Sequence, residues 1–268
     1  MTGTKTTAET GQEPARRGLA WGPPVLAAVL GLLLLFVGIG ALRTRYDSFA
    51  MVSTSMANGL PQGARTFTSP VTDGGASVQR GDVVLFDAGS WPGAERGEQL
   101  VKRVVGIGGD VVSCCDAQGR LQVNGRSITE PYLRLDDPRT GGPYRQQPFT
   151  VRVPQDSVLL LGDYRGNSRD SRSFLDTPDK GAIPRSAIKS VVVVAFGLGD
   201  GLRQISPNPA FTDAGLAGGG EVDRGYRYAF WLVVGGGALA LVSLVWLAVV
   251  GGLRALRRRR RQVLPVSP

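Results

Sequence analysis

Two long apolar stretches without a charged residue constrain this chain more than any other feature. Residues 21–42 and residues 228–253 contain no Asp, Glu, Lys or Arg. At a rise of about 1.5 Å per residue, a helix formed by either stretch is long enough to cross the roughly 30 Å hydrocarbon core of a bilayer. The sequence therefore predicts two transmembrane helices, one near each end of the chain.

A cleavable signal peptide is the alternative interpretation of the first stretch, and Arg16-Arg17 resembles part of a twin-arginine signal. The apolar run is, however, longer than the roughly 7–15 residues of a signal-peptide core, and no small-residue cleavage site follows it. We therefore expect residues 21–42 to remain as an anchor.

A cluster of arginines after the second stretch predicts the orientation. Positively charged residues at the edge of a span favour the cytoplasmic side. Two spans place both ends on one side, so we expect a multi-pass protein of the cell membrane with cytoplasmic segments at residues 1–20 and 254–268. Subtracting these six charges from the formal net charge of +9 leaves +3, so we expect no nucleic-acid partner. The six are Arg254, Arg257, Arg258, Arg259, Arg260 and Arg261.

Between the spans the sequence predicts a β domain. Short runs rich in Val and Leu alternate with turn sequences, Asn124-Gly125 is typical of a hairpin turn, and no long amphipathic helix is evident. We expect a mostly β fold, an extracytoplasmic antiparallel β-sheet domain at residues 43–197, followed by a linker at residues 198–227. The expected strands are residues 82–86, 100–105, 110–113, 121–123, 150–153, 157–161 and 190–196.

The chain contains no histidine, which excludes Ser-His-Asp and Cys-His catalysis and histidine-ligated zinc. Lysine is the natural general base that remains for a serine nucleophile. If residues 99–106 form a strand, Lys102 shares a face with Leu100 and Val104, and Arg103 takes the other face. Burial would lower the pKa of Lys102 to about 7–8, which suits a general base. The alternative is an amine that extends to solvent.

Four segments occur in a fixed order along the chain, and the first contains a candidate nucleophile just after the first span. Serines in such clusters are more often simple turn residues. In their order, however, these segments resemble the successive boxes of bacterial type I signal peptidases. They are Ser55-Met56, residues 81–84 (Gly-Asp-Val-Val), residues 102–110 (Lys-Arg-Val-Val-Gly-Ile-Gly-Gly-Asp) and residues 162–172 (Gly-Asp-Tyr-Arg-Gly-Asn-Ser-Arg-Asp-Ser-Arg).

The resemblance implies a role for each matching residue. Ser55 corresponds to the nucleophile, and Lys102 to the neutral lysine that takes its proton. Ser168 corresponds to the serine that orients this lysine by a hydrogen bond. Ser53 corresponds to the hydroxyl that stabilises the oxyanion together with the Ser55 backbone N–H. These roles form a complete acyl-transfer site without histidine and imply that the β domain at residues 43–197 is the catalytic domain.

Three further residues match supporting positions of the family. Asp170, with Arg172 and Arg103 as cationic partners, corresponds to the groups that hold the last box in shape. The resemblance implies a membrane-bound serine endopeptidase that removes N-terminal signal peptides, with exported preproteins and membrane lipid as partners and with neither cofactor nor metal. It also implies small side chains at the first and third substrate positions before the cut.

The chain departs from the family pattern at several positions. After Ser-Met the family shows x-Pro-Thr, whereas this chain has Ala57-Asn58-Gly59, and we expect a looser turn behind the nucleophile. Tyr164 stands where Asn is usual, and Gly108 replaces the usual Pro.

Cys114 and Cys115 are adjacent, and the spacing of about 3.8 Å between consecutive Cα atoms disfavours an ordinary disulfide. A strained vicinal bridge, two free thiols and an intermolecular bridge remain open, and we expect a non-catalytic role.

Two other function classes share parts of this pattern. A membrane-tethered binding or scaffold domain would need the anchors and the β core but no Ser-Lys pair. A self-cleaving serine-lysine regulator would be soluble and would carry a DNA-binding segment, which two spans do not favour. The sequence leaves the oligomeric state open.

Overall fold

The computed structural model describes residues 22–197, 201–206, 208–218 and 225–262. It divides into two compact units, one formed by Met1–Gly40 with Tyr228–Pro268 and the other by Ala41–Arg227. The expected cytoplasmic segment at residues 1–20, Trp21 and the end of the basic tail at residues 263–268 lie outside the described residues.

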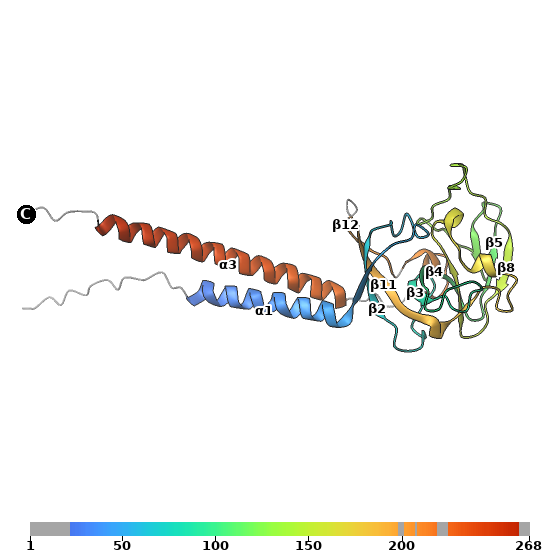
Figure 1. The fold of residues 1–268 in the computed structure, drawn as a ribbon, viewed down its shortest axis with the longest axis horizontal. Coiled ribbons are helices and arrows are strands. Elements are labelled where there is room, and N and C mark those ends of the chain that lie inside the picture. Colours follow the sequence, from blue (N-terminus) through green and yellow to red (C-terminus); the bar gives the residue numbers. More distant parts are fainter. Residues whose placement is uncertain (1–21, 198–200, 207, 219–224, 263–268) are drawn as a thin grey trace, which may run out of the picture. The chain divides into compact units, whose positions relative to one another are not determined.

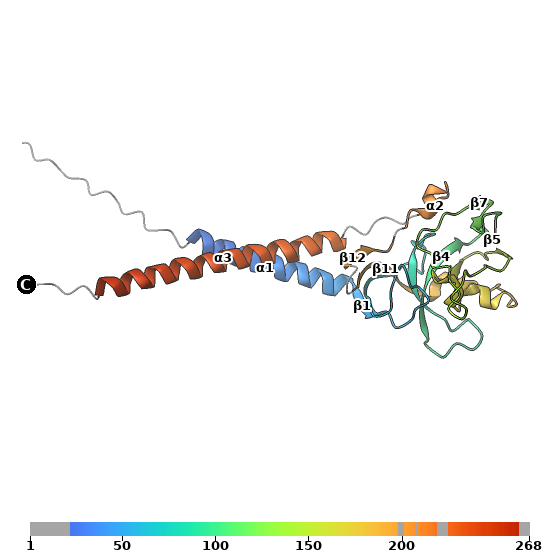
Figure 2. The same cartoon turned by 90° about the horizontal axis from the view of Figure 1, so that it is seen from above.

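The first unit consists of two apolar helices, α1 (Gly22–Arg45) and α3 (Gly225–Gln262), both long and apolar enough to cross a membrane. They run side by side in both ribbon views (Figures 1 and 2). A Cβ at Gly31 would lie 2.8 Å from the Gly236 carbonyl oxygen, and a Cβ at Gly38 would lie 2.9 Å from the Ala229 carbonyl oxygen. Glycine therefore allows the two antiparallel backbones to approach closely, as small residues do in membrane helix pairs.

The second unit is mostly β, as the sequence predicts, and every pairing between its named strands is antiparallel. One sheet has the order β1-β2-β11-β3-β4-β9-β10, with β12 paired to β11, and the other has the order β7-β6-β5-β8. The first sheet comprises β1 (Asp47–Ala50), β2 (Arg65–Pro70), β3 (Val83–Asp87), β4 (Gln99–Ile107), β9 (Ser157–Leu161), β10 (Ile183–Pro184), β11 (Ile188–Gly197) and β12 (Gly201–Gln204). The second comprises β5 (Val111–Cys114), β6 (Leu121–Val123), β7 (Arg126–Ser127) and β8 (Phe149–Arg152).

Helical structure in the described part of this unit is short. It consists of α2 (Ala210–Asp213) and the 3₁₀ turns η1 (Arg165–Asn167), η2 (Ser171–Phe174) and η3 (Arg185–Ala187). The expected hairpin is confirmed between β6 and β7, where Asn124 and Gly125 have φ values of 52° and 78°. Positive φ at both central residues is the requirement of the two-residue turn that matches the twist of a hairpin.

Strand β2 is absent from the strands expected from the sequence, because its buried residues are polar. Thr66 and Thr68 are fully buried, and their hydroxyls donate to the carbonyl oxygens of Phe49 (2.9 Å) and Asp47 (3.4 Å) on β1. These bonds compensate for the burial of the two hydroxyls. A search for alternating apolar residues cannot find such a strand.

The segment expected to be a linker, residues 198–227, carries structure in its described part. Strand β12 pairs with β11, and the Phe211 side chain of α2 is fully buried in a core cluster with Val105 and Leu159. The apolar residues here are too few to form a periodic pattern, so only their packing reveals that they belong to the domain. Residues 198–200, 207 and 219–224 of this segment lie outside the description.

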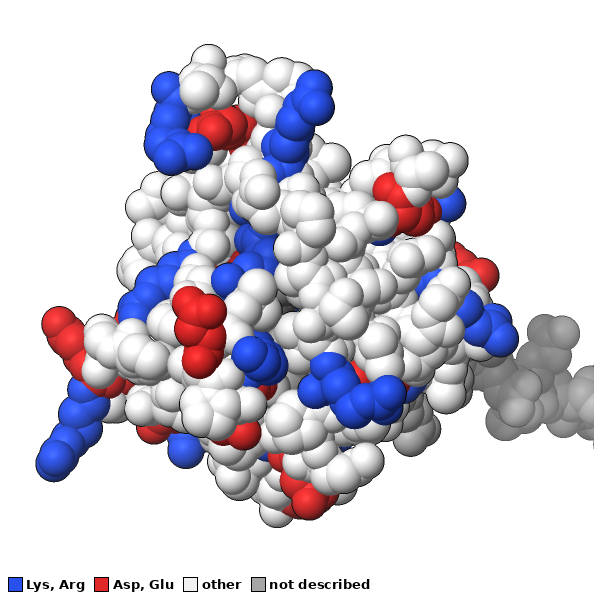
Figure 3. All heavy atoms as spheres, turned by 90° about the vertical axis from the view of Figure 1, so that its right-hand side faces the viewer, with Lys and Arg blue, Asp and Glu red and all other residues white. Residues whose placement is uncertain are grey.

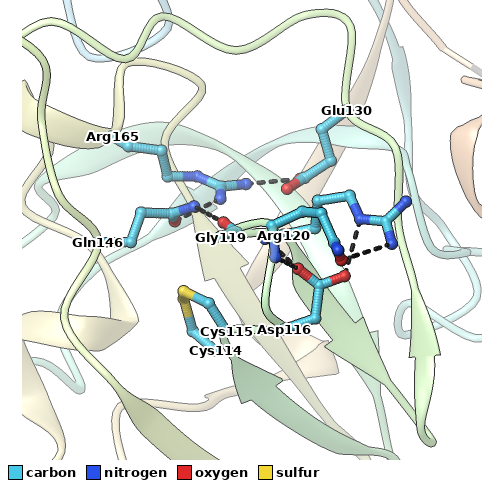
Figure 4. The surroundings of a disulfide bond; sticks show 9 residues. Cys114, Cys115, Asp116, Gly119, Arg120, Glu130, Gln146 and Arg165 are labelled. Atoms are coloured by element: carbon cyan, nitrogen blue, oxygen red, sulfur yellow. Dashed lines mark hydrogen bonds and ion pairs between the residues drawn. A yellow bond between two sulfur atoms is a disulfide. The ribbon is translucent and has the colours of Figure 1, made fainter.

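The two cysteines are joined to each other by a disulfide (Figure 4), which selects the vicinal bridge among the open alternatives. The turn that follows is held by Asp116, which accepts the backbone N–H groups of Gln118 (2.9 Å) and Arg120 (2.8 Å) and forms an ion pair with the Arg120 side chain. The bridge thus lies at the end of β5, beside a hydrogen-bonded turn.

Candidate active site

Ser55 and Lys102 meet inside the β domain. Lys102 Nζ on β4 lies 2.6 Å from Ser55 Oγ, and the two residues are 3% and 6% exposed. The burial of Lys102 rules out the alternative in which its amine extends to solvent. The segment of Ser55 is held by the neighbouring Met56, whose fully buried side chain packs against Val101 of β4 and other apolar residues.

Burial changes the acidity of the Lys102 ammonium. Desolvation lowers the pKa of Lys102 to about 8, although the nearby carboxylates of Asp170 and Asp163 favour the charged form. A substantial fraction of this amine is therefore neutral near pH 8, and only the neutral amine can accept the Ser55 proton.

Arg103 is also buried. The sequence predicts only that it lies on the face of β4 opposite to Lys102, and it does not predict that this face is buried as well. Asp163 compensates its charge in a two-bonded pair, with distances of 2.8 Å from Nε to Oδ1 and 2.6 Å from Nη2 to Oδ2. The guanidinium also donates to the Gly81 carbonyl oxygen (2.7 Å) and lies 3.8 Å from the centre of the Tyr132 ring.

This geometry corrects the expected partnership of Arg103 with Asp170. Neighbouring residues of a strand face opposite sides, and the carboxylate on the side of Arg103 is Asp163, which the sequence analysis did not select. The sequence feature that could have identified Asp163 is its position in the Gly-Asp pair directly after β9. Asp170 instead accepts Arg172 Nε (2.9 Å) and Nη2 (2.7 Å) and the Gly162 backbone N–H (2.9 Å).

Asp170 is fully buried, and its pKa is lowered. Burial alone would raise the pKa of Asp170, but the hydrogen bond and the charge of Arg172 outweigh it. The ion pair therefore keeps the loop of residues 162–172 closed around an ionised carboxylate at neutral pH.

Ser168 lies in this loop, next to the nucleophile. A Cβ at Gly162 would collide with the Ser168 side chain and would lie 2.8 Å from the Ser55 carbonyl oxygen, so the absence of a side chain at Gly162 brings the two serines together. Ser168 Oγ is buried and has no hydrogen-bond partner among the described residues. The bond to Lys102 that the resemblance implies is thus not formed in this arrangement.

Ser53 lies beside the backbone of the nucleophile. The Ser55 N–H donates to Ser53 Oγ at 3.1 Å, so the two groups expected to bind an oxyanion are neighbours. A substrate carbonyl oxygen that replaced this bond would meet the N–H of Ser55 and, after rotation, the hydroxyl of Ser53.

A pocket of about 260 Å³ opens beside the Ser-Lys pair. Its walls come from the end of β1 with the residues that follow it (49–53) and from β3 and β4, and most of the side chains that line it are apolar. Peptide side chains without charge fit such a lining. The apolar lining residues are Phe49, Ala50, Met51, Val52, Leu85, Leu100 and Val101, and the polar ones are Ser53, Ser55, Gln99 and Lys102.

The turn after the nucleophile is more firmly held than the sequence predicts. The Asn58 side-chain amide donates to the carbonyl oxygens of Tyr132 and Leu133, both at 3.1 Å. At Gly59 a Cβ would lie 2.8 Å from Asp163 Oδ2, so glycine lets the turn pass over the buried ion pair. The family pattern has a proline near this position, which would stiffen the turn. In this chain the hydrogen bonds of the Asn58 side-chain amide hold the turn instead.

Comparisons with known proteins agree with this site. The family described as "Signal peptidase, peptidase S26" matches residues 24–196. Signal peptidase I of Bacillus licheniformis is 30% identical over 163 residues, covering 60% of this chain and 81% of that protein. Signal peptidase I of Bacillus caldolyticus is 30% identical over 170 residues, covering 61% of this chain and 85% of that protein.

Among solved structures, signal peptidase I of Enterococcus faecalis is 26% identical in sequence and has a TM-score of 0.32, covering 42% of this chain and 95% of that one. The family match, by contrast, covers more than half of the chain and includes every box quoted above. This chain therefore belongs to the signal peptidase family, peptidase S26.

Proposed function

We propose that this protein is a membrane-anchored serine endopeptidase that removes N-terminal signal peptides from exported preproteins. The observation that carries the proposal is the buried contact of 2.6 Å between Lys102 Nζ and Ser55 Oγ, together with the lowered pKa of Lys102 of about 8. A lysine of this kind is costly to bury, and its contact with a serine hydroxyl suits a general base.

In the first half of the reaction, Ser55 Oγ attacks the carbonyl carbon before the scissile bond, and neutral Lys102 Nζ takes the hydroxyl proton. The Ser55 N–H and the Ser53 hydroxyl stabilise the negative charge on the substrate oxygen. When the tetrahedral intermediate collapses, the C–N bond breaks and the Lys102 ammonium gives its proton to the leaving amine. The signal peptide is then bound to Ser55 as an ester.

In the second half, Lys102 takes a proton from water, which attacks the ester. Collapse of the second intermediate releases the signal peptide as a carboxylic acid and returns the proton to Ser55 Oγ. Ser168 Oγ has no hydrogen-bond partner among the described residues, and a rotation of its side chain towards Lys102 would let it accept a hydrogen bond from the neutral amine and orient the amine lone pair towards Ser55. The pairs Asp170–Arg172 and Arg103–Asp163 support the loop and β4 without taking part in proton transfer.

The pocket beside Ser55 receives the substrate residues before the cut. Its apolar lining suits small uncharged side chains at the first and third positions before the scissile bond, and a bulky side chain there would displace the carbonyl from Ser55 Oγ. A misplacement of about 1 Å reduces the rate on the order of a hundredfold.

The β domain works outside the cytoplasm, where it meets preproteins at the lipid surface. In this arrangement residues 43–197 are extracytoplasmic, residues 198–227 connect them to the second span, and residues 1–20 and 254–268 are cytoplasmic. The arginines after Leu253 support this orientation.

The catalytic pair is tested by Ser55→Ala, Lys102→Met and the double variant in the full-length protein. Each should reduce cleavage of a preprotein on the order of 10⁴-fold or more, and the double variant should be no worse than either single one, because the two groups act as one unit. Lys189→Met, at an exposed position of β11, is the matched control and should retain full activity. Substantial cleavage by Lys102→Met would remove lysine as the base.

A further inference from the structure

A second pocket, of about 460 Å³, lies next to the catalytic pair. It shares no described residue with the pocket beside β1. Its walls come from the last box and the residues that follow it, and from the loop that precedes β8 with the first residue of that strand. The lining residues are Arg165, Gly166, Asn167, Ser168, Arg172, Ser173 and Leu175 on one side, and Pro138, Arg139, Tyr144, Gln147, Pro148 and Phe149 on the other. Asn167, which lines it, donates to Thr54 Oγ1 at 2.8 Å, directly before the nucleophile. The two pockets near Ser55 are therefore formed by different segments of the chain.

The second pocket is basic. Arg139, Arg165 and Arg172 line it, and its described lining contains no Asp or Glu. Each arginine has a carboxylate partner that is not part of the lining. Figure 4 shows Arg165 held between Glu130 and Gln146. Figure 3 shows a face of the domain on which basic side chains lie recessed between neutral residues as well as at the surface.

Arg172, which lines this pocket beside Tyr144, has one donor without a close hydrogen-bond partner in the described part of the chain. Its Nε and Nη2 groups bond to Asp170 and to the Arg165 carbonyl oxygen, whereas Nη1 is buried without a hydrogen-bond partner among the described residues. Burial lowers the pKa of Arg172, but Asp170 and the neighbouring Tyr144 phenol raise it overall, so the guanidinium stays charged. An unpaired buried cationic donor is rare in folded proteins, and a carboxylate that reached it would form a strong, charge-assisted hydrogen bond.

We propose that this pocket binds an acidic side chain located within the first few residues of the preprotein after the cut. The inference rests on the proposed function, in which the pocket beside β1 holds the residues before the scissile bond. The chain that leaves Ser55 on the opposite side reaches the wall formed by Asn167 and Ser168. There a carboxylate accepts Arg172 Nη1, and Arg139 at the mouth adds attraction.

The test uses the full-length enzyme in lipid and three series of preproteins that differ only in having Glu, Gln or Lys at one of the first four positions after the cut. At one of these positions kcat/KM should be higher for Glu than for Gln, on the order of tenfold, as expected for a charge-assisted hydrogen bond. The Lys substrate should be cleaved more slowly than the Gln substrate.

Arg139→Glu tests the charge of the pocket directly, since the Arg139 side chain is 83% exposed and is not needed for the core. It should reverse the order, so that Lys is preferred over Glu, and the milder Arg139→Gln should reduce the preference for Glu. Arg145→Glu, an exposed arginine on the same loop but outside the pocket lining, is the matched control and should keep the original order.

The outcomes separate the two proposals. Equal kcat/KM for Glu, Gln and Lys at all four positions would overturn the pocket while leaving the peptidase function intact. An unchanged order in folded Arg139→Glu, together with an undiminished preference for Glu in folded Arg139→Gln, would do the same. Cleavage of none of the substrates would overturn the peptidase function and the role of the pocket with it.

Discussion

At the scale of single residues, Lys102 is the group whose surroundings decide the chemistry. An ordinary lysine is protonated at neutral pH, whereas burial lowers the pKa of this one to about 8. Its neighbour Arg103 is buried as deeply but stays charged, because Asp163 binds it through two hydrogen bonds. The two adjacent basic residues thus differ in protonation because a guanidinium has a higher ordinary pKa than an ammonium and because, among the described residues, Arg103 has a carboxylate in direct contact.

The rate of cleavage should follow the deprotonation of Lys102. Below the pKa of about 8 the amine is protonated and inactive as a base, so kcat/KM should fall about tenfold for each pH unit below that value and should level off above it. The measurement is kcat/KM against pH for one preprotein. A rate independent of pH between 6 and 9 would contradict the assignment of Lys102 as the base.

The lowered pKa of Lys102 should also make the stability of the folded protein depend on pH. The pKa of Lys102 is about 8 in the folded protein and near its ordinary value of 10.5 when unfolded. Between these values the unfolded chain binds more protons, so the protein loses stability as pH falls through this window. Lys102→Met removes the penalty and should raise Tm at pH 7, with a smaller gain at pH 11. A Tm below that of the unaltered protein at both pH values would contradict this.

At the scale of elements, the turn after the nucleophile is held by hydrogen bonds from the Asn58 side chain. Asn58 has φ of 97° and joins the turn to the carbonyl oxygens of Tyr132 and Leu133, a conformation that other side chains adopt with strain. The turn closes with a hydrogen bond of 2.8 Å from the Leu60 N–H to the Met56 carbonyl oxygen, and Met56, the residue after Ser55, packs in a core cluster with Leu60 and Val101.

Two substitutions at Asn58 separate its backbone from its side chain. Asn58→Gly keeps the positive φ but removes the amide, and it should lower the free energy of unfolding by about 1–2 kcal/mol and reduce kcat more than it changes KM. Asn58→Ala should be worse, because it adds backbone strain. Urea unfolding and steady-state kinetics measure both effects. If both variants keep the unaltered kcat, the turn does not position Ser55.

At the scale of the whole molecule, the apolar helices and the β domain are distinct units of one chain. The expected topology places the β domain outside and the arginine-rich end inside. Protease added to intact spheroplasts should cut within residues 198–227 and spare the tail after Arg254, whereas lysed spheroplasts should lose the tail as well. Cleavage of the tail with survival of residues 198–227 in intact spheroplasts would reverse the orientation.

The sequence by itself determined what depends on local pattern. Apolar runs without charge indicate the two helices, short runs rich in Val and Leu between turn sequences indicate most strands, and Asn124-Gly125 indicates its hairpin. The absence of histidine leaves Lys102 as the natural partner of a serine nucleophile.

Only the tertiary structure decided which distant groups meet. Arg103 binds Asp163 rather than Asp170, Phe211 fills the core from a segment expected to be a linker, and Thr66 is buried because a β1 carbonyl accepts its hydroxyl. The physical reason is that a buried charge or hydroxyl is stabilised by its partner, and that partner lies far away along the chain, where local periodicity carries no information about it.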